Sequence, residues 1–187
     1  MSNSDKQKLR LLDTKLGKRN TRIMIICAVI MLASVLLHDV DHVIQANRWS
    51  YNIPLSLWAL NLIVYVLPVV SIFLAKSRRM SATPVCCLGG IVTSLSFVVL
   101  HCFGSSSGLN WGIWNYTYFE LMQGGTFLVD GQYIEVAAGG ITKLDWLLLF
   151  HVPLFSLPCS GISFIKYLDI RKAVKQNSST HYKLYWH

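Results

Sequence analysis

The sequence predicts an all-α membrane protein, a bundle of four transmembrane helices with a small cap at one end. Two observations about composition support this fold class. Hydrophobic residues make up 53% of the 187 residues and charged residues only 14%, whereas a soluble domain carries about 25% charge. In addition, four segments each contain about 20 mostly apolar residues, the length that a helix needs to cross a bilayer. Together these features argue against a soluble cytosolic enzyme and against a disordered chain.

The four predicted spans form one membrane domain, residues 23–168, between two basic tails at residues 1–22 and 169–187. A long basic stretch precedes the first span and no small-residue cleavage site follows it, so we interpret it as a retained span and not as a signal peptide. The predicted spans cover residues 23–42, 53–75, 84–104 and 146–168.

The distribution of basic residues is the third observation, and it predicts the orientation. Of the 17 Lys and Arg residues, all but Arg48 and Lys143 lie in the two tails, at the end of span four or in the loop after span two. The positive-inside rule therefore places both termini in the cytoplasm. We expect a multi-pass protein of a cytoplasmic-type cell membrane, embedded in the lipid bilayer. Topology accounts for the net charge of +8, so nucleic acid is not an expected partner.

The loop at residues 105–145 is the only long connection between spans, and it is predicted to lie outside the cell. It opens with a Ser/Gly-rich turn at residues 105–108, and an aromatic-rich stretch at residues 111–122 is expected to lie along the membrane surface. An Asp-Gly pair at residues 130–131 separates two alternating apolar runs, which predicts a β-hairpin over residues 126–136. The loop should therefore form a small cap over the outer mouth of the bundle.

Four histidines are predicted to lie at a similar depth in the outer half of the bundle. His38 and His42 belong to span one, His101 to span three and His151 to span four. A rise of about 1.5 Å per residue places them roughly 6 to 12 Å from the middle of the bilayer. Ionisable groups at that depth are costly, and they usually face the bundle interior and mark function.

These histidines predict a metal site. His38 and His42 are four residues apart and share one helix face, with Asp41 beside them. Imidazole nitrogens bind Zn, Cu and Fe, so we expect a transition-metal ion held by the four histidines. Asp41 is expected either to bind the metal or to orient a histidine. Three further residues are expected to orient ligands or to contact a substrate, namely Asn61, Asp39 and Asp145.

The sequence leaves three functions open. The first is a metal-binding membrane protein, with metal-dependent redox or hydrolytic chemistry on a lipid-soluble substrate such as a quinone. The second is an electron-transfer subunit with haem b held between two histidines. The third is a non-catalytic assembly subunit that contacts other membrane subunits, with the histidines in a structural polar core. A proton relay or a quinone-type pocket could use the same residues. No phosphate-binding loop, G-x-S-x-G or H-E-x-x-H motif occurs, so whether the protein is an enzyme stays open.

Overall fold

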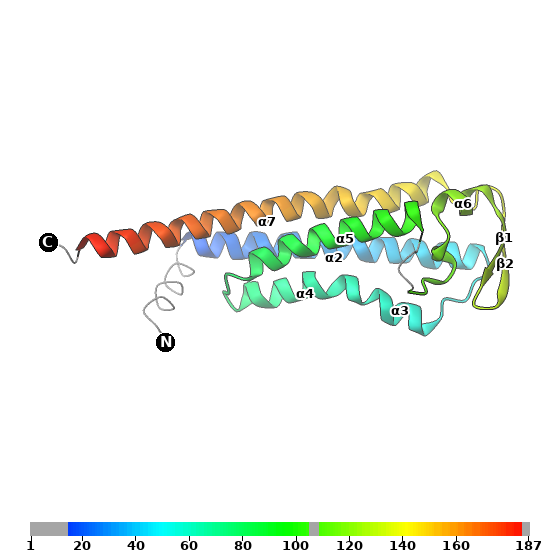
Figure 1. Ribbon diagram of the computed structural model, residues 1–187, viewed down its shortest axis with the longest axis horizontal. Helices are drawn as coiled ribbons and strands as arrows, with labels where there is room; N and C mark the ends of the chain where they lie inside the picture. The colour runs from blue at the N-terminus through cyan, green and yellow to red at the C-terminus, as the bar shows by residue number, and fades with distance from the viewer. Residues whose placement is uncertain (1–14, 105–108, 185–187) are drawn as a thin grey trace.

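Long helices running side by side form the body of the protein, in a computed structural model that describes residues 15–104 and 109–184. Within these residues, four helical segments are long and apolar enough to cross a membrane. These segments are α2 (Lys15–Arg48), α3 (Leu55–Asn61) together with α4 (Ile63–Lys76), α5 (Ala82–Phe103) and α7 (Lys143–Leu184) (Figure 1). The expectation of four long apolar helical segments is therefore confirmed. The turn predicted at residues 105–108 lies outside the described residues.

The helices extend well beyond the apolar segments that predicted them. The first was expected over residues 23–42, whereas α2 begins at Lys15 and ends at Arg48. The last was expected over 146–168, whereas α7 continues to Leu184. Hydropathy detects only the apolar part of a helix. Lys, Arg and Gln have good helix propensity, so the backbone hydrogen bonds of the helix continue into the polar flanking residues. Parts of both predicted tails are therefore helical.

The second apolar segment is interrupted at Leu62, between α3 and α4. Pro68 lies inside α4 and has no N–H to donate to the carbonyl of Val64, which weakens the helix just after the break. As a result α3 leans away from the axis of the bundle (Figure 1). This divergence separates α3 from α5 at the end of the bundle that carries the hairpin.

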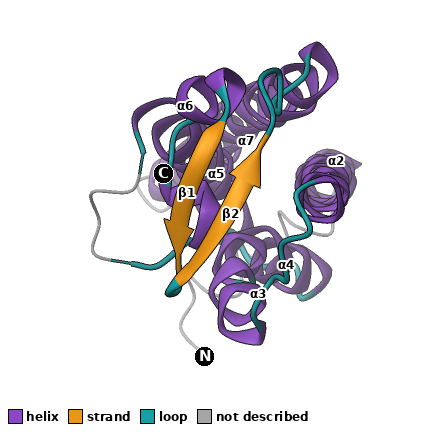
Figure 2. Ribbon diagram, turned by 90° about the vertical axis from the view of Figure 1, so that its right-hand side faces the viewer, coloured by secondary structure: helices purple, strands orange, loops and turns teal. Residues whose placement is uncertain are grey.

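The predicted hairpin is present and closes that end, which we call the hairpin end. Strand β1 (Gly125–Val129) pairs antiparallel with β2 (Gln132–Val136), and the two strands lie across the ends of the helices (Figure 2). Asp130 and Gly131 in the turn have φ angles of 50° and 78°. A two-residue type I′ turn needs a positive φ at both positions, which the Asp-Gly pair tolerates.

The aromatic-rich segment before the hairpin belongs to the core of the protein. It forms the short 3-10 helix η1 (Gly112–Asn115) and α6 (Tyr118–Gln123). Ile113, Trp114, Tyr118 and Leu121 are all buried. We expected this segment to lie along the membrane surface. Its buried side chains pack into the core at the hairpin end, where they are removed from water. Phe119 and Met122 of the same segment are exposed, so its position along the membrane surface stays a prediction.

Close packing of α5 on α7 sets the spacing of the bundle. A Cβ atom on Gly90 would lie 2.5 Å from the carbonyl oxygen of Ser156 and 2.8 Å from Cβ of Ser160. The Ser160 hydroxyl donates a 2.7 Å hydrogen bond to the carbonyl of Cys87 across the same contact. Small residues of this kind let two apolar helices approach closely, and they hold α5 in a defined position relative to its neighbours.

Candidate metal centre

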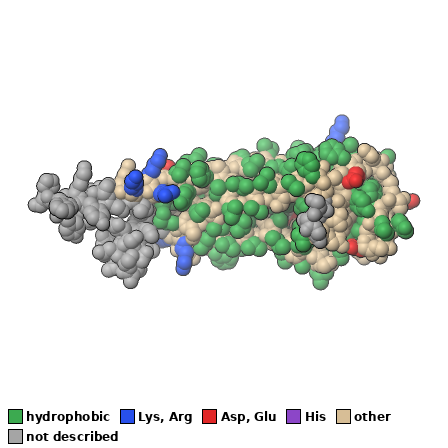
Figure 3. All heavy atoms as spheres, viewed as in Figure 1, with side chains coloured by type: hydrophobic (Ala, Val, Ile, Leu, Met, Phe, Trp, Pro, Cys, Tyr) green, Lys and Arg blue, Asp and Glu red, His purple; other side chains and the backbone are tan. Residues whose placement is uncertain are grey.

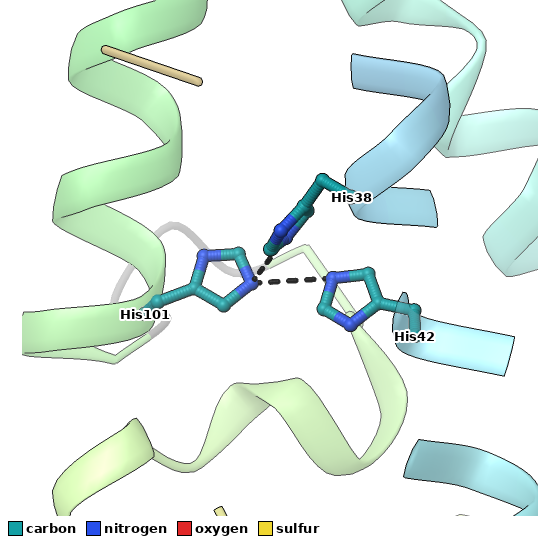
Figure 4. Close-up of side chains that lie close together, drawn as sticks. All are labelled: His38, His42 and His101. Carbon is teal, nitrogen blue, oxygen red and sulfur yellow. Dashed lines mark hydrogen bonds between the residues drawn. The ribbon is translucent and has the colours of Figure 1, made fainter. Parts of the chain in front are cut away.

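His38, His42 and His101 point toward one another inside the hairpin end of the bundle (Figure 4). Nε2 of His101 lies 3.3 Å from Nε2 of His38 and 3.2 Å from Nε2 of His42. One ring nitrogen from each of the three residues lies within 4.8 Å of the others. Three imidazoles that converge this closely make a candidate metal centre.

Two helices supply the three rings. His38 and His42 are one turn apart in α2, so they project from the same face, and their ring centroids are 4.4 Å apart. His101 comes from the last turn of α5. His38 and His101 are almost fully buried, and His42 is partly exposed. The site therefore forms where α5 packs against the polar stripe of α2, the face that carries Ser34, His38, Asp41, His42 and Gln45.

The backbone of α5 determines the tautomer of His101. Nδ1 of His101 lies 2.8 Å from the carbonyl oxygen of Phe97. A carbonyl oxygen can only accept, so Nδ1 carries the proton. In the neutral ring Nε2 then keeps its lone pair and faces the other two histidines. Metal-binding histidines typically donate their second nitrogen to a backbone carbonyl in this way.

Aromatic side chains enclose the three rings. The ring of Trp114 lies 4.1 Å from that of His42, and the ring of Tyr118 stands edge-on to His101 at 4.8 Å. On the other side Phe97 lies 4.8 Å from His38. These contacts replace water around the imidazoles with apolar surface, which strengthens electrostatic interactions inside the site.

Gln45 ties this aromatic enclosure to α2. Its side-chain amide nitrogen donates to Asp41 at 2.7 Å and to the Tyr118 hydroxyl at 3.0 Å. Its amide oxygen accepts from the indole nitrogen of Trp114 at 2.8 Å. Burial raises the pKa of the Tyr118 hydroxyl well above its ordinary value, so this group remains a neutral hydrogen-bond partner. Gln45 lies on the polar stripe of the sequence, but nothing in the sequence indicates its partners Trp114 and Tyr118.

Asp41 and Asp145 belong to a polar cluster beside the histidines. Asp41 is buried and accepts a hydrogen bond from Gln45. Arg48 donates to Asp145 at 3.0 Å and to the carbonyl oxygen of Gly140 at 2.7 Å. Neither carboxylate lies in the group of three converging histidines. Asp41 would therefore influence the metal site indirectly, through its hydrogen bond with Gln45. Direct binding of the metal by Asp41 stays a prediction.

His151 also lies outside the group of three. Its Nδ1 contacts the carbonyl oxygen of Leu148 one turn earlier in α7, and its ring packs against Phe155. Nε2 of His151 is buried and has no hydrogen-bond partner in the described part of the chain. His151 is close enough to His38 for an electrostatic interaction. Its expected role as a fourth ligand stays a prediction.

Asp39 of α2 and Asn61 of α3 form a second polar group beside the histidines. Asn61 donates to Oδ2 of Asp39 at 2.7 Å, and the hydroxyl of Tyr65 donates to the same oxygen. Both Asp39 and Asn61 line a cavity of about 350 Å³ between α2, α3, α4 and α5. His42 and His101 line the same cavity, so it connects the two groups of residues. The role of Tyr65 had no indication in the sequence.

Comparison with known proteins returned no similar protein: no family model, no curated sequence and no solved structure matches the chain.

Proposed function

We propose that the protein is an integral membrane protein that binds one transition-metal ion through His38, His42 and His101. The observation that carries this proposal is the separation of their ring nitrogens, 3.3 Å and 3.2 Å. Two ligands on a tetrahedral ion with metal–nitrogen bonds of about 2.0–2.1 Å lie about 3.3 Å apart. Two of the three separations thus fit a pair of ligands on one ion, and all three nitrogens lie within 4.8 Å of one another.

The same distances favour a single ion over haem. Two histidines on opposite sides of a haem iron lie about twice the metal–nitrogen bond length, about 4 Å, apart. The Nε2 atoms of His38 and His101 are only 3.3 Å apart. Nε2 of His42 also lies next to Nε2 of His101 (Figure 4), which leaves no room for a haem between the rings. A hydrogen-bonded polar core is the remaining alternative, because ring nitrogens at these distances could also share protons.

The surface of the protein supports a membrane location. On the face shown in Figure 3, hydrophobic side chains cover the middle of the bundle. Most Lys and Arg side chains on this face gather at the end opposite the hairpin, and most Asp and Glu side chains lie near the hairpin end. With the positive-inside rule, both termini and the loop between α4 and α5 lie in the cytoplasm. The histidines then lie in the outer half of the bilayer.

Three protein ligands leave one coordination position for water or a substrate, as in catalytic metal sites. A bound ion there would supply an activated water or a redox centre. The chain itself contributes the enclosure: Trp114 and Tyr118 limit the access of water, and the adjoining cavity offers space for an apolar molecule. We therefore propose a metal-dependent enzyme that acts on a lipid-soluble substrate.

Metal analysis of detergent-purified protein tests this proposal. We expect close to one Zn, Cu or Fe ion per chain in the wild type, and loss of that ion in His38→Ala, His42→Ala and His101→Ala. His181→Ala, which changes a histidine far from the site in the sequence, is the matched control and should keep its metal. An absorption spectrum with a Soret band would instead support haem.

One result would overturn the proposal. If the wild type stays metal-free and colourless after reconstitution with Zn, Cu, Fe and haem, the three histidines form a structural polar core. The variants should then lower the stability of the bundle without changing any bound ion, because each leaves buried nitrogens without partners.

A further inference from the structure

Asp39 lines the cavity beside the histidines, and within the described residues only one of its two carboxylate oxygens accepts hydrogen bonds. Asp39 is only 6% exposed. Its Oδ2 accepts from Asn61 and Tyr65. Its Oδ1 is buried and has no hydrogen-bond partner in the described part of the chain. A buried carboxylate oxygen without a donor is costly, so this arrangement indicates a place for a donor from outside the protein.

The rest of the cavity is apolar. Its volume of about 350 Å³ falls in the range of small-molecule pockets, about 300–1,000 Å³. Its walls are formed mainly by aliphatic and aromatic side chains of α3, α4 and α5, with Trp111 and Trp114 at the hairpin end. A ligand that fits must therefore be largely apolar and carry a single polar group, positioned next to Asp39.

The cavity is reached from the side of the bundle. Three of its lining residues are also strongly exposed on the outer surface of the helices: Ile63 is 62% exposed, Val92 43% and Val99 49%. They belong to α4 and α5, so these two helices carry part of the exposed lining of the cavity. In the proposed orientation this surface faces lipid, and a ligand enters from the bilayer.

The charges around the cavity indicate which donor is accepted. A carboxylate oxygen only accepts, so the ligand group must be a hydroxyl or an amine. His42 and His101 line the same space, and a metal ion on them adds positive charge. A cationic ammonium group is repelled by that ion, whereas a neutral hydroxyl group is not.

We propose that this cavity binds a lipid-soluble alcohol, with its hydroxyl group donating to the carboxylate of Asp39 and its apolar body against α4 and α5. Asp39 and His42 are three residues apart in α2 and are neighbours on its surface. The hydroxyl end of the ligand is therefore held beside the proposed metal ion. A role of the alcohol as the substrate rests on the proposed function, whereas binding of the alcohol in the cavity does not require the metal.

Photolabelling tests the binding directly. The probes are a photoreactive long-chain primary alcohol, its methyl ether and the corresponding primary amine, each applied to purified protein in lipid nanodiscs. We expect the alcohol to label peptides of α3, α4 and α5 that line the cavity, with about tenfold preference over the ether, because the ether cannot donate to Asp39. Labelling by the alcohol should be the same with and without metal, whereas labelling by the amine should rise when the metal is removed, because no ion then repels the ammonium group.

Three variants locate the interaction. Asp39→Leu should remove the preference for the alcohol over the ether while labelling by both continues. Val92→Trp fills the cavity and should reduce labelling by both probes. Val69→Trp, on the outer surface of α4 and away from the cavity lining, is the matched control and should behave as the wild type does.

The outcomes separate this inference from the proposed function. Equal labelling by alcohol and ether in the wild type, or labelling spread evenly over the lipid-facing surface, would overturn the inference even if the metal is present. Stronger labelling by the amine than by the alcohol in metal-loaded protein would overturn the choice of a hydroxyl group. Selective labelling by the alcohol in a protein that binds no metal would support the cavity and contradict the metal centre.

Discussion

Nδ1 of His101 lies 2.8 Å from the carbonyl oxygen of Phe97, one turn earlier in α5. This hydrogen bond directs the lone pair of Nε2 toward His38 and His42. A backbone group thus leaves Nε2 of His101 available as a ligand in the proposed metal site. The properties of the site then depend on how α2, α5 and the segment containing η1 and α6 are held together.

Metal binding should stabilise the folded protein in a way that depends on the group of three histidines. At a free metal concentration of 100 times Kd, the free energy of unfolding should rise by about 2.7 kcal/mol. Thermal unfolding in mild detergent, with and without a chelator, measures this rise in the wild type. It should vanish in His42→Ala and persist in His151→Ala. If His151→Ala also abolishes it, the site has four protein ligands.

Gln45→Leu should weaken metal binding although Gln45 does not face the ion. The substitution removes the hydrogen bonds that hold Trp114, Tyr118 and Asp41, so the enclosure of His42 and His101 loosens. Loss of a supporting hydrogen bond typically reduces metal affinity about 10- to 100-fold. Metal titration of the variant measures the affinity. Gln45→Glu keeps an acceptor for the Trp114 indole, so its metal affinity should fall less than that of Gln45→Leu. An equal fall in affinity in both variants would contradict this explanation.

Gly90→Ala should destabilise the bundle by about 1–3 kcal/mol, because the new methyl group overlaps Ser156 and Ser160. Gly161→Ala is the matched control, since a Cβ atom there meets nothing within 4 Å. In a helix, alanine is favoured over glycine by about 1 kcal/mol, so the control should be neutral or more stable. Denaturant unfolding in detergent compares the two. Similar stabilities would show that α5 and α7 are not tightly packed.

The orientation of the bundle can be read from single cysteines at its two ends. Tyr133 lies on the hairpin and Ser77 in the loop between α4 and α5, and both are exposed. A membrane-impermeant maleimide applied to intact cells should label Tyr133→Cys and should label Ser77→Cys only after the cells are opened. The native cysteines, which all lie within the four apolar helices, serve as the background in the wild type. The reverse pattern would invert the proposed topology.

Local patterns in the sequence predicted the helices and the hairpin correctly. A run of about 20 apolar residues has few alternatives to a helix, and Asp130-Gly131 is suited to one kind of turn. The ends of α2 and α7 could not be predicted in this way, because polar helix-forming residues continue a helix without any change in its backbone. The break at Leu62 was missed because a single polar residue, Asn61, does not interrupt the apolar run on either side of it.

The candidate site was predicted in part. The spacing of His38 and His42 along one helix face needs no tertiary information, and the depth of His101 follows from counting residues along α5. Whether the rings face one another depends on the rotation of each helix about its own axis, which a depth estimate does not contain. This rotation joins His101 to the pair on α2 and leaves His151 outside the group of three.

The sequence by itself determined the number of apolar helices, the hairpin and the residues available for a metal, because each follows from composition or from spacing along one element. The tertiary structure decided which of those residues meet. It brought Trp114 and Tyr118 from a distant segment onto the histidines, and it opened the cavity at Asp39 where α3 diverges. Such contacts join residues 59 to 73 positions apart, as for His42 with His101 and Gln45 with Tyr118, so only packing of the whole chain creates them.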